Sequence, residues 1–481
     1  MKRLLLLFAL LVLIQSHAQI GVMGQKVSSP EYTRGEYFGY SLSTSGDFTF
    51  IGTNDLSSGS HQTSKAGTAY VMKKDSAGTW HFFQNLSSPD KHDYDRFGER
   101  VFVEGNSAIV SAFRHELGVN GVSRSEEAGA VYYYEFEDTA WVFKQKIVAK
   151  DRGRFKQFGV QIALKGNVML IGSNGDRAGV PGYNGRNSHA GSAYVFIKDS
   201  TGHWYQHQKL MASDKAHRAS FGGSVAMSED FLVIGAPGDS WLGNHEYVNM
   251  GGAAYIFKKD SLGMWFETQK LRGHNQQKLD SFGWGIGVSD SSLIIGANLE
   301  EVVDSNGDTI QDAGAAYVYV LDSNSNWNEL YRMTACDPSH RASFGYAISI
   351  NDDKGIIGAP HSVEFEKYMA GAAYFYYRTS EGYWQQTTKV TEDIPGVDFR
   401  FGSVTAISDS TYLISSHRSG RRMYNGPTHK KWGETFILND FPNVINCKSS
   451  KLLTYSIAPD LTRITEPADD TLIEEEIVIA D

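Results

Sequence analysis

Side chains suited to binding a ligand occur in four stretches of this chain that do not recur elsewhere in it. They combine arginines, which bind oxyanions in a fixed fork geometry, with histidines and with aromatic rings that can stack on a ligand. The four stretches hold Arg114 and His115; Arg177; Trp241, His245 and Tyr247; and Arg418, Arg421 and Arg422. The alternative is ordinary surface polarity, since most charges at a protein rim contribute little to binding.

A fifth stretch has the spacing of a loop that could hold calcium. Asp304, Asn306, Asp308 and Asp312 place side-chain oxygens at positions 1, 3, 5 and 9, and Ca²⁺ prefers oxygen ligands. Position 12, where calcium loops commonly have a bidentate glutamate, is Ala315. The alternative is a polar turn without metal, because Asp, Asn and Gly build turns on their own. Calcium is therefore a candidate cofactor, and no nucleotide, flavin or haem is indicated.

A repeat with a period of 57 to 63 residues positions all five stretches. In each copy a Phe-Gly pair is followed, fourteen residues later, by a Gly or Ser that closes an aliphatic run. The seven pairs begin at Phe38, Phe97, Phe158, Phe221, Phe282, Phe344 and Phe401. An Ala/Gly-Gly element, an aromatic run and, in six copies, a tryptophan follow. Self-similarity at this period indicates a repeat architecture.

Each repeat contains four short apolar segments bounded by turn residues, which predict four antiparallel strands. Seven such units predict an all-β fold, a seven-bladed β-propeller of four-stranded antiparallel blades. The seventh repeat has no fourth segment, but Gln25-Lys26-Val27 precedes Phe38 by thirteen residues, the interval from Gln208 to Phe221. We therefore expect the N-terminal strand to complete the last blade and close the ring.

These motifs resemble the FG-GAP repeats of the integrin α-subunit head and of bacterial surface proteins. The best copies are Phe221-Gly222 with Val233-Ile234-Gly235-Ala236-Pro237, and Phe344-Gly345 with Ile356-Ile357-Gly358-Ala359-Pro360. The resemblance covers residues 23–440 and implies a propeller, a fold that hosts many roles. Integrin blades carry calcium loops between the Phe-Gly strand and the Gly-Ala-Pro strand. Because that interval is fixed at fourteen residues here, the resemblance implies the bacterial, exported form without integrin calcium loops.

The loops between strands two and three vary most in length, from 13 to 19 residues counted from the closing Gly or Ser to the second glycine of the Ala/Gly-Gly element. They share one face of the ring with the loops that lead from strand four into the next blade. Recognition usually resides in variable loops on a rigid scaffold. Because nearly all length variation lies on this rim, we expect it to be the working face, and the four stretches of candidate binding residues fall in its loops.

The ends of the chain predict three segments. Residues 1–18 are expected to be a secretory signal peptide, residues 19–440 the propeller, and residues 441–481 an acidic extension with a net charge of −5. No later apolar stretch approaches the twenty residues of a transmembrane helix. The two cysteines, Cys336 and Cys447, are too few for a disulfide scaffold, and we expect two unpaired thiols.

These features favour an exported, secreted or surface-located protein that binds an extracellular glycan, peptide or protein without catalysis. One alternative is a propeller enzyme acting on glycans as a hydrolase or lyase, although the sequence reveals no nucleophile–base pair. The other is a structural part of a surface assembly. The net charge of −10 argues against nucleic acid, which requires a basic footprint. Nothing in the sequence indicates the oligomeric state.

Overall fold

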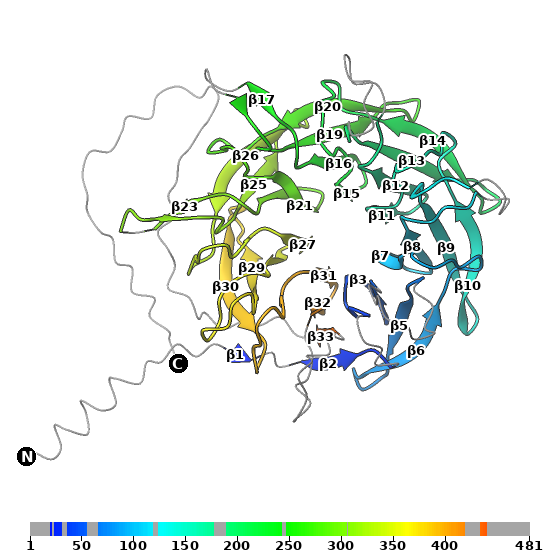
Figure 1. The fold of residues 1–481 in the computed structure, drawn as a ribbon, viewed down its shortest axis with the longest axis horizontal. Helices are drawn as coiled ribbons and strands as arrows, with labels where there is room; N and C mark the ends of the chain where they lie inside the picture. Colours follow the sequence, from blue (N-terminus) through cyan, green and yellow to red (C-terminus); the bar gives the residue numbers. More distant parts are fainter. Residues whose placement is uncertain are drawn as a thin grey trace, which may run out of the picture.

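The chain folds into a ring of seven blades (Figure 1). The computed structural model describes residues 20–21, 24–30, 36–54, 66–118, 124–177, 189–242, 247–304, 306–418 and 433–439. Over these residues the structure is all-β, with no helix and with four antiparallel strands in every blade. The predicted fold class is therefore confirmed. The expected signal peptide and acidic extension lie outside the described residues.

Each blade runs from a strand beside the ring axis to a strand at the circumference. The axial strands are β3 (Ser41–Ser45), β7 (Phe97–Glu104), β11 (Ile162–Lys165), β15 (Ser224–Met227), β21 (Phe282–Val288), β27 (Ala347–Asn351) and β31 (Thr405–Ser408). The second strands are β4 (Phe48–Gly52), β8 (Ser107–Ala112), β12 (Val168–Ser173), β16 (Phe231–Ala236), β22 (Ser292–Ala297), β28 (Lys354–Ala359) and β32 (Thr411–Ser416). In Figure 1 the axial strands surround the centre of the ring.

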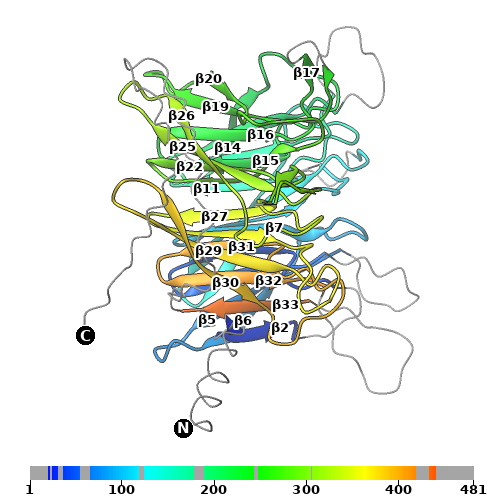
Figure 2. The same cartoon turned by 90° about the vertical axis from the view of Figure 1, so that its left-hand side faces the viewer.

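The aromatic runs form the third strands, and the tryptophans begin most of the outer strands. The third strands are β5 (Ala69–Lys74), β9 (Ala130–Glu137), β13 (Ser192–Lys198), β19 (Ala253–Lys259), β25 (Ala315–Leu321), β29 (Ala372–Arg378) and β33 (Glu434–Leu438). The outer strands are β6 (Trp80–Leu86), β10 (Ala140–Ile147), β14 (Trp204–Leu210), β20 (Trp265–Leu271), β26 (Trp327–Met333), β30 (Trp384–Thr391) and β2 (Gln25–Ser28). Seen edge on, the strands run across the ring from one face to the other (Figure 2).

The N-terminal strand closes the ring, as the sequence predicts. Strand β2 pairs antiparallel with β33, with Gln25 opposite Ile437 and Lys26 opposite Phe436. The Gln25 side chain also bridges blade 7 to blade 1. Its amide donates to the Trp80 carbonyl, and the Trp80 amide donates back over 2.7 Å. Gln84, Gln145, Gln208 and Gln269 make the same two bonds to the next blade's tryptophan.

The Phe-Gly pairs and the repeated glycines join neighbouring blades at the backbone. The Phe97 amide at the start of blade 2 donates to the Ala66 carbonyl of blade 1 over 2.6 Å. A Cβ on Gly67 would lie 2.1 Å from the Phe97 carbonyl oxygen, and Gly67 has a φ of +87°. Only glycine fits that contact and that backbone conformation. The hydrophobic core lies between blades too, where Phe50 meets the edge of Trp141 with ring centroids 4.9 Å apart.

One strand and two hairpins add to the four-stranded blades of the ring. Strand β1 (Ile20–Gly21) pairs parallel with β30 and makes blade 6 five-stranded. Two hairpins extend from strand two-to-three loops: β17 (Trp241–Leu242) with β18 (Tyr247–Val248), and β23 (Val302–Val303) with β24 (Thr309–Ile310). β17 and β23 lie at the outer margin of the ring in Figure 1. None of the described residues forms a helix that is long and apolar enough to cross a membrane.

Cys336 takes part in a disulfide bond. The expectation of two unpaired thiols is therefore wrong. The partner of Cys336 lies outside the described residues.

Candidate binding site on the Phe-Gly face

One face of the ring gathers both sets of variable loops. In six blades, backbone bonds among the described residues tie the strand two-to-three loop to the loop that enters the same blade. Examples are the Gly238 amide, which donates to the Ala219 carbonyl over 3.1 Å, and the His361 amide, which donates to the Ala342 carbonyl over 3.2 Å. We call this side the Phe-Gly face, because the Phe-Gly pairs begin the axial strands there. Two groups of side chains stand out among the described residues of these loops, one between blades and one near the axis.

The outward side chains form ion-pair networks that join blades. In blade 4 the buried Asp239 carboxylate lies 2.7 Å from the Lys270 ammonium, which lies 2.6 Å from Asp214 in the loop leaving blade 3. The Tyr255 hydroxyl donates to Asp214 over 2.8 Å. Although burial disfavours the charged carboxylate, Lys270 and Tyr255 hold the pKa of Asp214 below its usual value. Corresponding networks contain Lys146, Lys209 and Lys389.

His115 belongs to one of these networks. Its side chain is fully buried, with Nδ1 2.8 Å from the Asp95 carboxylate and Nε2 3.3 Å from Asp90. Lys146 contacts the same ring. The structure thus places this candidate residue inside the junction of blades 1 and 2, where no solvent reaches it. Its neighbour Arg114 faces the surface, with its guanidinium 3.5 Å from Glu127.

The side chains near the axis form a group that we call the axial cluster. It consists of Tyr40, Arg100, Trp284, Tyr346, His361, Arg400, His417 and Arg418. These residues come from blades 5, 6, 7, 1 and 2. Tyr346 and Trp284 have ring centroids 5.4 Å apart, Tyr40 and His417 also 5.4 Å. The cluster therefore spans five consecutive blades at the Phe-Gly end of the axis.

Three guanidinium groups converge within the axial cluster. Burial, followed by Tyr40 on the far side of blade 7, raises the pKa of the Tyr346 hydroxyl, and the positive charges of Arg100, Arg400 and Arg418 oppose that rise. Arg400 and Arg418 each lie 2.8 Å from Asp398. The Arg100 Nε donates to Gln161 over 3.1 Å, and Nη1 donates to the Glu99 carbonyl. Positive charge thus gathers at the axis of a chain whose net charge is −10.

Two histidines of the axial cluster are paired with serines. His417 Nδ1 lies 2.6 Å from the Ser403 hydroxyl and His361 Nδ1 3.0 Å from the Ser343 hydroxyl. Burial, followed by Arg400, lowers the pKa of His361 to about 4 and that of His417 to about 3. Both imidazoles are therefore neutral near pH 7. Ser403 and Ser343 are 5% and 2% exposed, so neither hydroxyl is open to a large substrate.

The other rim candidates lie away from the axis or outside the described residues. The backbone of the β17–β18 hairpin pairs Trp241 with Val248 and Tyr247 with Leu242, which brings these two candidates onto one hairpin of blade 4. The Arg177 guanidinium lies over the Phe155 ring, 5.5 Å from its centroid. His245, Arg421 and Arg422 lie outside the described residues.

The candidate calcium loop is the tip of the β23–β24 hairpin. The Asp304 carboxylate accepts hydrogen bonds from the Asn306 and Asp308 amides, each 2.9 Å long. The same carboxylate-capped turn recurs at Asp260 and Asp322. Asp312 follows with a φ of +50°. Among the described side chains no group of three or more His, Cys, Asp or Glu lies close enough to hold a metal ion.

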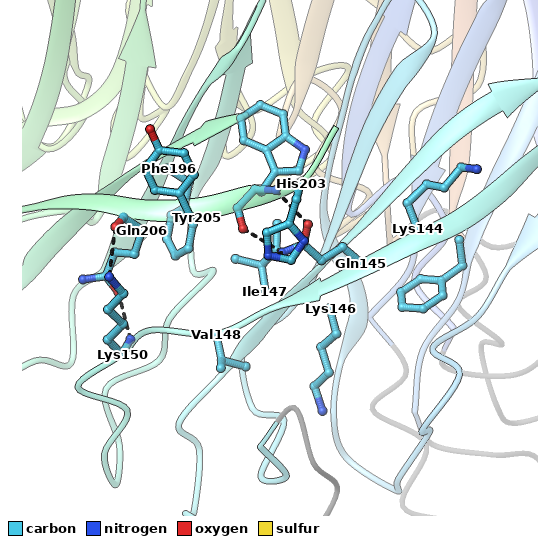
Figure 3. A pocket seen from close by; sticks show the side chains of 12 residues that line it. Lys144, Gln145, Lys146, Ile147, Val148, Lys150, Phe196, His203, Tyr205 and Gln206 are labelled. Atoms are coloured by element: carbon cyan, nitrogen blue, oxygen red, sulfur yellow. Dashed lines mark hydrogen bonds between the residues drawn. The ribbon is translucent and has the colours of Figure 1, made fainter. Parts of the chain in front are cut away.

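A groove of about 540 Å³ lies away from the axis, on the circumference between β10 and β14 (Figure 3). Lys144, Lys146, Lys150 and Tyr205 line it. Lys144 and Lys146 already pair with carboxylates, so two of its three lysines are neutralised. The groove is therefore a weaker candidate for an anion site than the axial cluster.

Sequence reasoning found Arg418 but missed most of the axial cluster. The signal is the residue directly after each Phe-Gly pair, a fixed position that holds six residue types in seven blades and supplies three of the eight members of the cluster. That residue is Tyr40, Glu99, Val160, Gly223, Trp284, Tyr346 and Ser403 in turn. A position that only packed the blades would keep its residue type, as the Phe and Gly before it do.

The fold and the repeats define the class of this chain as a seven-bladed β-propeller. Four stretches, residues 141–196, 204–257, 265–319 and 327–376, match the family described as FG-GAP repeat. Each stretch runs from the tryptophan of one outer strand through the first strands of the next blade. Four FG-GAP repeats are thus recognised within the propeller, which confirms the resemblance.

The solved structures that are similar to this chain are distant from it in sequence. A candidate 6-phosphogluconolactonase of Bacteroides fragilis is 12% identical, with a TM-score of 0.46, over 74% of this chain and 85% of that chain. A periplasmic gluconolactonase of Pseudomonas aeruginosa is 11% identical, with a TM-score of 0.42, over 74% of this chain and 86% of that chain. No curated protein matches the chain. These similarities carry no argument about activity.

Proposed function

We propose that this protein is an exported, non-enzymatic binding or adhesion propeller that recognises an extracellular glycan, peptide or protein through its Phe-Gly face. One observation carries the proposal. Residues repeated from blade to blade are used to join blades, whereas the side chains that change from blade to blade gather at the axis and on the rim. A rigid ring that presents a non-repeating set of arginines and aromatic rings is suited to recognition.

The proposal is tested by screening glycan and protein arrays with the mature protein, with and without calcium. A hit weakened about tenfold by Trp241→Ala, or by Arg418→Ala combined with Arg421→Ala, supports binding through this face. Phe266→Ala is the matched control, because Phe266 is 47% exposed on outer strand β20. A hit that all of these variants leave intact would contradict the use of this face.

Export is part of the same proposal, and it rests on the N-terminal sequence. Expression with the complete N-terminus, followed by N-terminal sequencing of the exported protein, tests it. We expect the mature chain to begin at Gln19. Retention of the uncleaved chain inside the cell would contradict export.

A second candidate function is hydrolysis of extracellular glycans, favoured by the Ser403–His417 contact of 2.6 Å. A neutral imidazole beside a hydroxyl is the arrangement of a base and a nucleophile. The burial of Ser403 makes this candidate the weaker one. Turnover of any member of a glycan panel that is lost in Ser403→Ala, while Ser343→Ala retains it, would favour the enzyme over the binding protein. Retention of a protein partner without any glycan would instead favour a structural role in a surface assembly.

A further inference from the structure

The geometry of the axial cluster points to an acidic saccharide as the ligand, bound with its anionic group toward the arginines and its ring against Trp284 and Tyr346. This inference rests on the proposed function and narrows its ligand class. The repeat does not require the residues of the axial cluster, so packing between blades does not explain their identity.

The positive charge of the axial cluster favours an anionic ligand. Arg400 and Arg418 share a single carboxylate, that of Asp398, so this group keeps one positive charge in excess. Arg100 donates hydrogen bonds to the uncharged Gln161 amide oxygen and Glu99 carbonyl. The nearby Glu99 carboxylate, on which Arg100 also acts, is paired with a further arginine, Arg96, at 3.3 Å. Guanidinium groups bind carboxylate and sulfate oxygens in pairs of parallel hydrogen bonds. An oxyanion placed among these arginines would therefore meet uncompensated positive charge.

The exposed aromatic pair of Trp284 and Tyr346 favours a ligand that contains a sugar ring. Trp284 is 42% exposed although it lies beside the axis, and Tyr346 packs against it with an interplanar angle of 45°. Exposed indole rings present an apolar face, and a pyranose ring offers a matching face of C–H groups. An acidic side chain of a peptide would satisfy the arginines but leave this aromatic pair uncovered.

Neutral hydrogen-bonding groups complete the site. Tyr40 and His361 lie against the two ends of the arginine group, with Tyr40 5.8 Å from the Arg100 guanidinium and His361 5.8 Å from the Tyr346 ring. Uncharged hydroxyl and imidazole groups suit sugar hydroxyls, since they can donate or accept. At the equivalent positions blades 3 and 4 carry only Val160 and Gly223, which leaves the opposite side of the axis less obstructed.

The test measures binding of trigalacturonate and of a sulfated heparin tetrasaccharide by calorimetry at 50 and 300 mM NaCl. We expect at least one of the two to bind, and its affinity to fall severalfold at the higher salt because exposed charges are screened. For trigalacturonate, the methyl-esterified trisaccharide keeps the rings and removes the charge, so it should bind at least tenfold more weakly. Failure of both acidic saccharides to bind would overturn the inference.

Variants separate the two halves of the site. Arg100→Gln and Trp284→Ala should each weaken binding about tenfold. Matched controls are Arg378→Gln, at the end of β29 away from the Phe-Gly face, and Phe266→Ala on the circumference; both should leave affinity unchanged. Thermal unfolding of each variant checks that it is folded. Equal binding of triglutamate, unaffected by Trp284→Ala, would replace the saccharide with an acidic peptide.

The outcome is separable from that of the proposed function. A neutral glycan or a protein that binds in the array screen, and is lost in the rim variants, would uphold the binding face while overturning the acidic saccharide. Absence of every rim-dependent partner would contradict both.

Discussion

The Arg418 guanidinium lies 2.8 Å from the Asp398 carboxylate and 5.8 Å from the centre of the Tyr37 ring. These contacts join three segments that are distant in the sequence: the strand two-to-three loop of blade 7, the loop entering blade 7, and the segment before blade 1. Arg400 binds the same carboxylate. Arg418, a candidate from the sequence that also belongs to the axial cluster, is therefore held in a defined position. It lies at the seam between blades 7 and 1, where the ring closes.

Replacing Arg418 with Gln should weaken ligand binding with little loss of stability. The ion pair is about a quarter exposed on both sides, so its loss should cost at most about 1 kcal/mol. Binding should weaken about tenfold, because the variant removes a charge of the axial cluster. Calorimetry with the array-identified ligand and thermal unfolding measure the two effects. A large loss of stability with unchanged affinity would make Arg418 a purely structural residue.

Replacing Gln208 with Ala should lower the free energy of unfolding by about 1–3 kcal/mol, because two backbone groups of Trp265 lose their partner. Gln25→Ala removes the same bonds at the seam, where strand β2 is joined to blade 7 without a direct chain connection. We expect Gln25→Ala to accelerate proteolysis near the N-terminus in addition to lowering stability. If Gln208→Ala and Gln25→Ala are cleaved near the N-terminus at the same rate, the junction of blades 7 and 1 is not weaker than the other junctions.

Stability should fall as pH rises through the titration of Asp280. This carboxyl is 1% exposed, and burial together with the nearby Glu300 carboxylate raises its pKa to about 7. The folded protein therefore holds a proton that the unfolded chain releases near pH 4, so this group destabilises the fold progressively from pH 4 to above pH 7. Asp280→Asn should be more stable than the wild type by about 1–3 kcal/mol at pH 8, and this gain should vanish at pH 4.

Asp95 occupies the equivalent position in blade 2 and provides the control. It faces the His115 imidazole at 2.8 Å instead of a carboxylate. Asp95→Asn should therefore destabilise the protein at pH 8, opposite in sign to Asp280→Asn. Thermal unfolding of both variants at pH 4, 6 and 8 checks the pair, and a common sign would show that the partner does not decide the effect.

Calcium binding at the Asp304 loop can be distinguished from a metal-free turn. Asp304→Asn keeps a side-chain oxygen for the Asn306 and Asp308 amides, so the turn should lose less than about 1 kcal/mol. A calcium site would lose its metal in this variant, and a chelator would lower the unfolding temperature of the wild type only. Calorimetric titration with calcium measures the first effect directly. If the wild type and Asp304→Asn show the same calcium titration and the same unfolding temperatures with calcium and with chelator, the loop is a polar turn without metal.

The fold could be predicted from the sequence because its constraints repeat. A Cβ on Gly67 or on Gly129 would collide with the carbonyl oxygen of the following Phe-Gly pair, so each blade junction imposes the same residues. The closing strand was predictable for a related reason. Gln25 stands where Gln208 stands in its own blade, and both bind a tryptophan backbone.

The site was less predictable because it depends on which side of a loop each residue occupies. Arg114 and His115 are neighbours in sequence, but Arg114 faces the surface whereas His115 is buried between blades. Trp284 and Tyr346 are 62 residues apart and meet only because adjacent blades place equivalent positions side by side. A comparison of equivalent positions in neighbouring blades predicts this contact, whereas the composition of the loops does not.

The pairing of β2 with β33 also sets the order of events during biosynthesis. Gln25 is made first but finds its partner Ile437 only after more than 400 further residues have left the ribosome. Until then the growing chain is an arc, and the blades at its two ends each lack one neighbour. Because such long-range pairing is slow, ring closure should be the late, rate-limiting step of maturation, and a truncated chain should remain open and accessible to chaperones and proteases.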